Sequence, residues 1–133
     1  MTMPVRILVV EDSAPDVFLL QKALRENQVE FELTRFEDGE QALRALQTLE
    51  MPELIILDLN VPKINGMDLL RAIRKEPGMA KVPIAVLTSS GALQDKVDAI
   101  ASGADRFITK PVSLQSFVRT VGGSIKELID QSQ

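Results

Sequence analysis

The sequence predicts an α/β fold, a doubly wound (βα)5 sandwich with a five-stranded parallel sheet between two layers of helices. Short runs rich in Val, Ile and Leu alternate five times with amphipathic segments of helical length, and such strict alternation is typical of parallel sheets. Several runs are almost continuously apolar, as strands buried on both faces should be. The chain has 133 residues, 45% of them hydrophobic, which suits one domain with a core of its own. We therefore expect a single domain over residues 1–133.

The first strand and the first helix have clear signals. Residues 5–10 read as a buried strand. Ser13 can cap the helix that follows, since Pro15 suits a first turn and Asp16 lies three residues after the cap. Apolar residues then recur at helical spacing, namely Val17, Leu20 and Leu24.

The second and third strands differ in pattern. Residues 31–36 alternate apolar with polar side chains, which predicts a strand at an edge of the sheet. Residues 54–57 are entirely apolar and predict the third strand, which ends at Asp58. Between them, after a turn at Asp38-Gly39, a helix is predicted by the spacing of three apolar residues: Ala42, Leu46 and Leu49.

The alternation continues through the next helix and strand. A loop over residues 62–66 follows the third strand. The helix after it stops before Pro77-Gly78 and carries an apolar stripe of Leu69, Leu70 and Ile73. Residues 82–87 predict a fourth strand, which ends at Thr88.

The last elements are a helix, a short strand and a helix. Residues 93–102 predict a helix with Gly103 as its C-cap, and Phe107 and Ile108 predict the fifth strand. The last helix begins at Ser113 and carries five apolar residues: Leu114, Phe117, Val121, Ile125 and Leu128.

The pair Gly122-Gly123 inside this last helix is unusual, because each Gly costs about 1 kcal/mol relative to Ala. Two explanations stay open. One is close helix packing in a homodimer built through the last strand and helices, and the other is a local break in the helix.

Chemically distinctive residues follow the C-terminal ends of four predicted strands: Glu11-Asp12, Asp58, Thr88 and Lys110-Pro111. These ends meet at one edge of an open parallel sheet, where ligand sites are built. With right-handed crossovers and the strand order 2-1-3-4-5, the acid pair and Asp58 face each other across a crevice between strands one and three. Acids, a hydroxyl and a Lys together predict a metal-assisted site that accepts a phosphoryl group.

Composition narrows the chemistry of such a site. The sequence contains no Cys and no His, which excludes disulfides, thiolate ligands, cysteine nucleophiles and phosphohistidine within this chain. Any metal is therefore expected to be bound by oxygen, which favours Mg²⁺, Mn²⁺ or Ca²⁺ over Zn²⁺.

Charge and the N-terminal sequence bear on location and partners. The formal net charge is −4, and without a basic stripe we expect no nucleic-acid partner. The apolar segment near the N-terminus is too short for a signal peptide or a membrane span. We therefore expect a soluble, cytoplasmic protein without membrane association.

Four stretches together resemble one known family. They are Val9-Val10-Glu11-Asp12-Ser13, Ile56-Leu57-Asp58-Leu59-Asn60-Val61-Pro62 with Gly66 after it, Leu87-Thr88-Ser89-Ser90, and Gly103-Ala104-Asp105-Arg106-Phe107-Ile108-Thr109-Lys110-Pro111. The family is the receiver domains of two-component response regulators, which have a flavodoxin-like fold, and the resemblance covers residues 4–127. The stretch over residues 57–63 looks closest to small single-domain regulators that partner phytochrome kinases of the cyanobacterial type.

The resemblance implies roles for the acids. Asp58 would accept a phosphoryl group from a sensor histidine kinase or a phosphotransfer protein. Mg²⁺, which Mn²⁺ could replace, would be bound directly by Asp12 and Asp58, through water by Glu11, and by the backbone carbonyl of Asn60. The chain would be a signalling domain rather than an enzyme, since it would promote only its own phosphorylation and dephosphorylation.

The resemblance also implies a switch. Lys110 would pair with a phosphoryl oxygen, and its peptide bond to Pro111 would be cis. Thr88 would move toward the phosphoryl group while Phe107 rotates inward, which would bias the surface of the fourth helix, fifth strand and fifth helix toward a downstream protein target. Asn60 and Ser90 lie where the family tunes the lifetime of the phosphorylated state.

Three alternatives are weighed against this interpretation. A covalent Asp phosphatase would need an acid where Asn60 stands, and it would carry its motif on the first strand of a longer chain. A flavodoxin-like mononucleotide-binding protein would hold the phosphate of its ligand in the loop after strand one, where Glu11-Asp12 would repel it. A phosphorylation-independent interaction module on the same fold usually lacks one or more of five site positions. This sequence retains all five, namely Glu11, Asp12, Asp58, Thr88 and Lys110.

Overall fold

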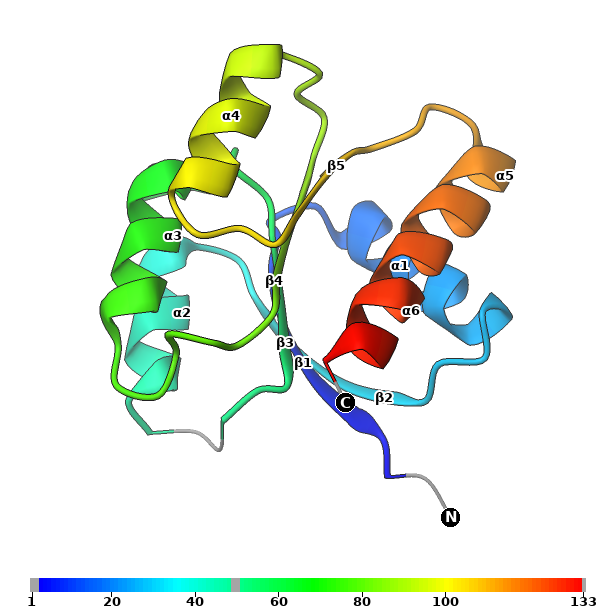
Figure 1. Cartoon of the computed structure of the whole chain (residues 1–133). Helices are drawn as coiled ribbons and strands as arrows, with labels where there is room; N and C mark the ends of the chain where they lie inside the picture. The colour runs from blue at the N-terminus through cyan, green and yellow to red at the C-terminus, as the bar shows by residue number, and fades with distance from the viewer. Residues whose placement is uncertain (1–2, 49–50, 133) are drawn as a thin grey trace.

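Five parallel strands form one sheet at the centre of the fold, in the order β2-β1-β3-β4-β5 (Figure 1). The computed structural model describes residues 3–48 and 51–132. The strands are β1 (Val5–Val10), β2 (Phe31–Phe36), β3 (Leu54–Leu57), β4 (Ile84–Thr88) and β5 (Arg106–Thr109). The predicted fold class and strand order are confirmed, and β2 lies at an edge of the sheet as its alternating pattern predicted.

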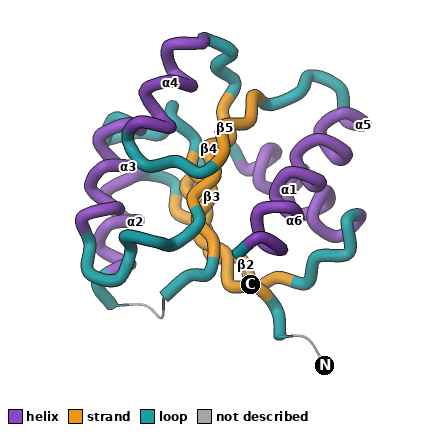
Figure 2. The backbone as a smooth tube through the Cα atoms, in the orientation of Figure 1, coloured by secondary structure: helices purple, strands orange, loops and turns teal. Residues whose placement is uncertain are grey.

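Helices cover both faces of the sheet. One face carries α1 (Ala14–Glu26) and a continuous helical run made of α5 (Leu114–Ser116), η1 (Phe117–Val121) and α6 (Gly122–Gln131). The other face carries α2 (Gly39–Leu46), α3 (Gly66–Lys75) and α4 (Leu93–Ala101). Figure 2 shows the strands between these two helical layers. No helix within the described residues is long and apolar enough to cross a membrane.

Alternate residues of β1 enter different cores. Val5, Ile7 and Val9 lie in the cluster that α1 and α6 complete, whereas Leu8 and Val10 lie in the cluster under α3. All five are buried, and complete burial of such a side chain is worth about 1.5–3 kcal/mol. Burial on both faces is the reason why this strand is almost continuously apolar in sequence.

The second helix begins earlier than predicted. Asp38 is extended and caps it, because its Oδ1 accepts a hydrogen bond from the Gln41 amide at 2.8 Å. Asp38-Gly39 is therefore a helix start rather than a turn between elements. Leu49, which the apolar spacing placed in this helix, lies outside the described residues.

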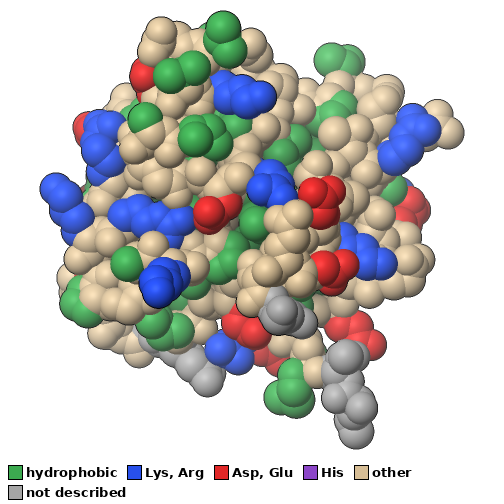
Figure 3. Space-filling view, viewed as in Figure 1, with side chains coloured by type: hydrophobic (Ala, Val, Ile, Leu, Met, Phe, Trp, Pro, Cys, Tyr) green, Lys and Arg blue, Asp and Glu red, His purple; other side chains and the backbone are tan. Residues whose placement is uncertain are grey.

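Capping distinguishes α1 from α4. Ser13 Oγ accepts from the Asp16 amide at 3.3 Å, so the predicted cap of α1 is confirmed. By contrast, α4 begins after Ala92 without a side-chain cap, and of its nine described residues only Ala99 is buried. Its C-cap is Ser102 rather than the predicted Gly103, which follows with a φ of +115°, a conformation that suits glycine. Hydrophobic side chains lie exposed over α4 (Figure 3), namely Leu93, Val97 and Ile100.

The glycine pair in the last helix has an explanation within the chain. The helical run turns π-helical over η1, immediately before Gly122. A Cβ on Gly122 would lie 2.6 Å from the Ala23 carbonyl and 2.1 Å from Asn27 Nδ2, so α1 approaches too closely for any other residue. Close packing is thus intramolecular and is accompanied by a local irregularity. Gly123 has no atom within 4 Å of its would-be Cβ, and nothing in the described residues explains it.

The peptide bond between Lys110 and Pro111 is trans, so the expected cis bond is wrong. No peptide bond is cis within residues 3–48 and 51–132. The trans form is favoured for bonds before Pro by about 0.5–1 kcal/mol. The Lys110 amide donates to the Thr88 carbonyl at 2.7 Å with the trans bond in place, so the position of Lys110 does not require the cis form.

Arg74 links the segments that precede β4 and β5, at the end of the sheet where these strands begin. Its side chain is 16% exposed and donates to the backbone carbonyls of Met79, Val82 and Gly103 at 2.6–3.0 Å. It also pairs with Asp105 Oδ2 at 3.1 Å. One side chain therefore holds the loops before β4 and β5 against α3.

Candidate functional site

Backbone hydrogen bonds extend beyond the strand ends and place the predicted site residues side by side. The Asp58 amide donates to the Val10 carbonyl at 3.0 Å, and the Lys110 amide donates to the Thr88 carbonyl at 2.7 Å. Since β1 lies next to β3 and β4 next to β5, Glu11 faces the same edge. The structure thus brings together residues from four strand ends.

Lys110 lies at the centre of this edge. Its Nζ donates to Glu11 Oε1 at 2.6 Å, to Asp58 Oδ2 at 2.7 Å and to Asp16 Oδ2 at 2.7 Å. The Lys110 side chain is only 11% exposed, and those of Glu11 and Asp58 are 6% exposed. Burial alone would lower the pKa of Lys110, but its hydrogen bonds to Asp16, Asp58 and Glu11 outweigh burial and raise that pKa above its usual value. The ammonium group therefore stays charged.

Asp58 is held as a carboxylate. Its Oδ1 accepts from the Asn60 amide at 3.0 Å, while its Oδ2 accepts from Lys110. Burial alone would raise its pKa, but the hydrogen bonds from Lys110 and the Asn60 amide, with a smaller effect of Thr88, lower the pKa of Asp58 below its usual value. The ionised form is the nucleophilic form of such a group.

Glu11 is held against ionisation. Burial is the largest cause that raises its pKa and the hydrogen bond from Lys110 lowers it, while the nearby charge of Asp58 raises it; together these effects bring the pKa to about 7. Its Oε2 also accepts from the Ser13 amide at 3.2 Å. The two buried acids at this edge thus have pKa values moved in opposite directions.

Arg35 braces the backbone of the acid pair. Its Nε donates to the Glu11 carbonyl and its Nη2 donates to the Asp12 carbonyl, both at 3.0 Å. The register pairs Arg35 with Val9 across the edge of the sheet. Asp12 itself is exposed, so its carboxylate faces solvent beside the buried cluster.

Thr88 lies buried in the site, at the end of β4. It is completely buried, and its Oγ1 accepts from Asn60 Nδ2 at 3.5 Å and from the Ser90 amide at 3.4 Å. The Ser90 hydroxyl donates to the Asp95 carboxylate in the first turn of α4. A chain of polar contacts therefore runs from Asn60 through Thr88 to the start of α4.

Phe107 lies on β5, the strand next to the one that carries Thr88. It is partly buried against the core cluster under α3, and the register places it next to Val86 of β4. Thr109, two residues further along the strand, donates from Oγ1 to the Ser90 carbonyl at 2.9 Å. The predicted switch residues thus border the segment that leads into α4.

The acids at this edge fit a hard cation by their chemistry. Every side-chain acceptor around Lys110 is a carboxylate oxygen, which is the ligand type that Mg²⁺ and Mn²⁺ prefer. Three carboxylates surround one ammonium group, which leaves negative charge for a second cation to neutralise. Within the part of the chain that the structure describes, no three acids are arranged around one point as a metal centre. The ligand roles of Glu11, Asp12, Asp58 and the Asn60 carbonyl stay predictions.

Two residues of the site were missed from the sequence. The sequence predicts Asp16 only as part of a helix start, although an acid in the first turn after β1 lies at the edge where the strand ends meet. The sequence predicts Arg35 only as a polar residue of an edge strand, although the register places it beside Val9, near the end of β1. Both contacts join residues at least 23 positions apart in the sequence, so helical or strand periodicity does not reveal them.

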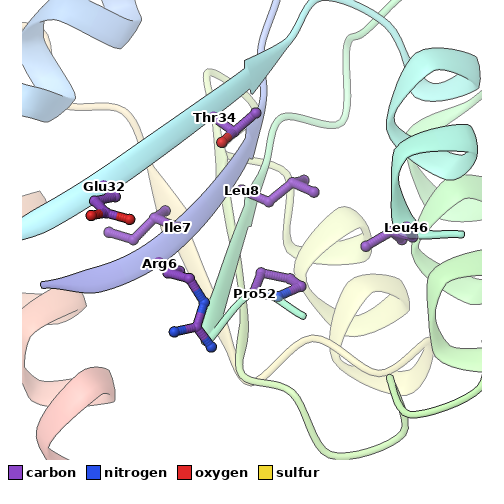
Figure 4. A pocket seen from close by; sticks show the side chains of 7 residues that line it. All are labelled: Arg6, Ile7, Leu8, Glu32, Thr34, Leu46 and Pro52. Carbon is purple, nitrogen blue, oxygen red and sulfur yellow. The ribbon is translucent and has the colours of Figure 1, made fainter. Parts of the chain in front are cut away.

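A pocket lies elsewhere, over β1 and β2 (Figure 4). Its volume is about 200 Å³, and it is lined by Arg6, Ile7, Leu8, Glu32, Thr34, Leu46 and Pro52. The Arg6 guanidinium donates two hydrogen bonds to the Met51 carbonyl, from Nε at 3.2 Å and from Nη2 at 3.1 Å. None of these residues belongs to the predicted site.

Comparison with known proteins gives the family. The model of the response regulator receiver domain matches residues 7–122. The chain is 33% identical over 126 residues to response regulator Rcp1 of Synechocystis sp., covering 90% of this chain and 86% of that protein. It is 38% identical over 130 residues to the DNA-binding response regulator MtrA of Mycobacterium tuberculosis, covering 98% of this chain and 54% of MtrA. The chain thus spans about half the length of MtrA.

Solved structures agree with the sequence relatives. The phosphorylated cyanobacterial phytochrome response regulator RcpA superposes with a TM-score of 0.87 at 29% identity, over 98% of both chains. The Mn²⁺-bound form of Rcp1 superposes with a TM-score of 0.82 at 33% identity, over 90% of this chain and 91% of that one. The expected resemblance to regulators of cyanobacterial phytochromes is confirmed. This chain belongs to the response regulator receiver domain family.

Proposed function

We propose that this chain accepts a phosphoryl group on Asp58 from the phosphohistidine of a sensor histidine kinase or a phosphotransfer protein. The observation that carries the proposal is the environment of Asp58. Its carboxylate is buried at the strand edge, its pKa is lowered, and the Lys110 ammonium lies 2.7 Å from Oδ2. A nucleophile that is ionised and adjacent to a fixed positive charge suits attack on an anionic phosphoryl group.

The transfer is a substitution at phosphorus. One oxygen of Asp58 bonds to phosphorus, the bond from phosphorus to the donor nitrogen breaks, and an acyl phosphate forms. Lys110 pairs with a phosphoryl oxygen as a point charge, while the Asn60 amide holds the carboxylate in place. Thr88 donates its hydroxyl to another phosphoryl oxygen.

A divalent cation, Mg²⁺ or Mn²⁺, belongs to the same proposal. Asp12 and Asp58 would hold it directly, with Glu11 acting through water and the Asn60 carbonyl completing the ligands. When bound, it would neutralise charge on the transferring group. The crystal structure of the related Rcp1 in a Mn²⁺-bound form supports this part of the proposal.

The output of the modification is a change in protein contacts. The acyl phosphate carries about −1.5 to −2 charges by analogy with other phosphorylated side chains, where the ionised carboxylate of Asp58 carried one, and Thr88 moves toward it while Phe107 rotates inward. The polar contacts from Thr88 through Ser90 to Asp95 give that movement a route to α4. We propose a downstream protein target for this surface, and we propose that residues 1–133 form one receiver domain.

The test is intact mass spectrometry after incubation with acetyl phosphate, with and without Mg²⁺. Wild type should gain one phosphoryl group only when Mg²⁺ is present. Asp58→Asn should gain none, whereas Asp68→Asn, which removes an exposed acid paired with Arg71 on α3, should behave as wild type.

Two results would contradict the proposal. An adduct that persists in Asp58→Asn would place the modification elsewhere. Absence of any adduct, together with no binding of the stable phosphoryl mimic beryllofluoride, would favour a phosphorylation-independent interaction module on the same fold.

A further inference from the structure

Asp16 contributes a third carboxylate to Lys110 from outside the predicted site. An ammonium group has three N–H donors, and the three acceptors at 2.6–2.7 Å use all of them. Glu11 and Asp58 belong to the proposed metal and phosphoryl chemistry. Asp16 belongs to neither, and its side chain is 30% exposed at the mouth of the site.

The start of α1 fixes where Asp16 lies. Ser13 caps the helix by accepting from the Asp16 amide at 3.3 Å, and Pro15 stiffens the first turn. An acid in a first turn is also favourable for the helix itself. That general effect accounts for an acid at this position, but it does not account for a 2.7 Å contact with a lysine 94 residues away.

The contacts of Lys110 compete with the reaction. An incoming phosphoryl group needs a hydrogen bond from Lys110, and a cation at the acids would draw on oxygens of Glu11 and Asp58. Either event takes up acceptors that hold the ammonium group in the resting site. The contact with Asp16 depends on neither of them.

We propose that Asp16 is a positioning residue that keeps the Lys110 ammonium group beside Asp58 while the other two acceptors are engaged. The inference rests on the proposed phosphoryl transfer to Asp58. Without Asp16, the flexible four-carbon stem of Lys110 leaves the ammonium group poorly placed at the moment of transfer. The resting site would also lose one of its three hydrogen bonds to Lys110.

The kinetic experiment measures phosphorylation rate against acetyl phosphate concentration in the presence of Mg²⁺. In Asp16→Ala, we expect the maximal rate constant to fall about tenfold, as small misplacements of reacting groups do, with the half-saturating concentration unchanged. Asp16→Glu should restore most of the rate, because it restores a carboxylate. Glu26→Ala is the matched control, since Glu26 lies on the same helix and pairs with Lys22 at 3.0 Å.

A second readout does not depend on phosphorylation. In metal-free, ¹⁵N-labelled protein, the buried Lys110 ammonium group should give a slowly exchanging ¹H–¹⁵N signal, assigned by its loss in Lys110→Arg. Asp16→Ala should lose this signal to solvent exchange, while Glu26→Ala should keep it.

These outcomes separate the two proposals. If Asp16→Ala is only less stable, with the maximal rate and the Lys110 signal of wild type, Asp16 is structural and the inference is overturned. An unchanged maximal rate overturns it even if the signal changes. If wild type takes no phosphoryl group, the proposed function fails, and the Lys110 signal in Asp16→Ala alone supports or overturns positioning by Asp16.

Discussion

The guanidinium of Arg35 donates to the backbone carbonyl of Asp12 at 3.0 Å, and this contact fixes the loop that carries the two adjacent acids. Arg35→Gln should therefore loosen the loop and weaken Mg²⁺ binding about 10–100-fold, the usual effect of losing a residue that orients metal ligands. Isothermal titration calorimetry with Mg²⁺ would measure it. Arg44→Gln, on the exposed side of α2, is the control, and an affinity for Arg35→Gln equal to that of the control would contradict the prediction.

Removal of Lys110 leaves carboxylates at a buried edge without their cation. In the metal-free protein at neutral pH, Lys110→Met should lower the free energy of unfolding by about 3 kcal/mol, because an unpaired buried charge is costly. Urea unfolding followed by circular dichroism would measure the loss. The loss should shrink at acidic pH as the carboxylates take up protons, and a loss that does not depend on pH would argue against this cause.

The raised pKa of Glu11 gives stability a defined pH dependence. Its value is about 7 in the native state against 4.5 ordinarily, so the native state binds more protons between these values. The stability contributed by Glu11 is therefore complete below pH 4.5 and is lost as pH rises to 7. The lowered pKa of Asp58 acts in the opposite sense, because its contribution is present at neutral pH and is lost as pH falls through its native pKa.

Glu11→Gln isolates the first effect. Measured by urea unfolding in EDTA, the free energy of unfolding of the variant relative to wild type should rise between pH 5 and pH 8. Glu26→Gln, an exposed acid of α1, should show no such trend. Parallel pH profiles for wild type and Glu11→Gln would contradict the assigned pKa.

The two adjacent glycines of the last helix should respond oppositely to alanine. Gly122→Ala places a Cβ against the Ala23 carbonyl and the Asn27 amide, and such overpacking should cost about 1–3 kcal/mol. Gly123→Ala meets no atom within 4 Å and should stabilise the protein by up to about 1 kcal/mol through helix propensity. Thermal unfolding of the two variants against wild type tests both signs at once.

The sequence predicted the parts of the fold that depend on local pattern. Apolar runs over residues 5–10 and 54–57 predicted two buried strands, since each strand is covered on both faces and nearly every residue, Arg6 excepted, carries the apolar signal. The positions of Asp58 and Thr88 followed, because a residue that ends a parallel strand lies at a known edge. The helix over residues 39–46 was placed less well, since Asp38 and Gly39 suit a turn and a helix start equally.

Long-range contacts could not be predicted in the same way. The grouping of Lys110 with Asp16 joins residues 94 positions apart, and only the packed fold decides which acid a flexible lysine reaches. The π-helical turn over η1 comes immediately before Gly122, where α1 approaches closely, and no local propensity encodes that approach. The prediction of a cis bond before Pro111 was wrong. It came from the resemblance to a family, and no feature of the adjacent sequence favours the cis form.

The contacts of Arg74 link distant segments in a chain that has no cysteine and so no disulfide. Its side chain joins α3 to the carbonyls of Met79, Val82 and Gly103, the last of them 29 residues away. Linking distant points of a chain restricts the unfolded ensemble only when the link is covalent, so this link stabilises the native state alone and opens whenever the fold opens. The segments before β4 and β5 are thus held to α3 reversibly, by hydrogen bonds where small secreted domains use disulfides.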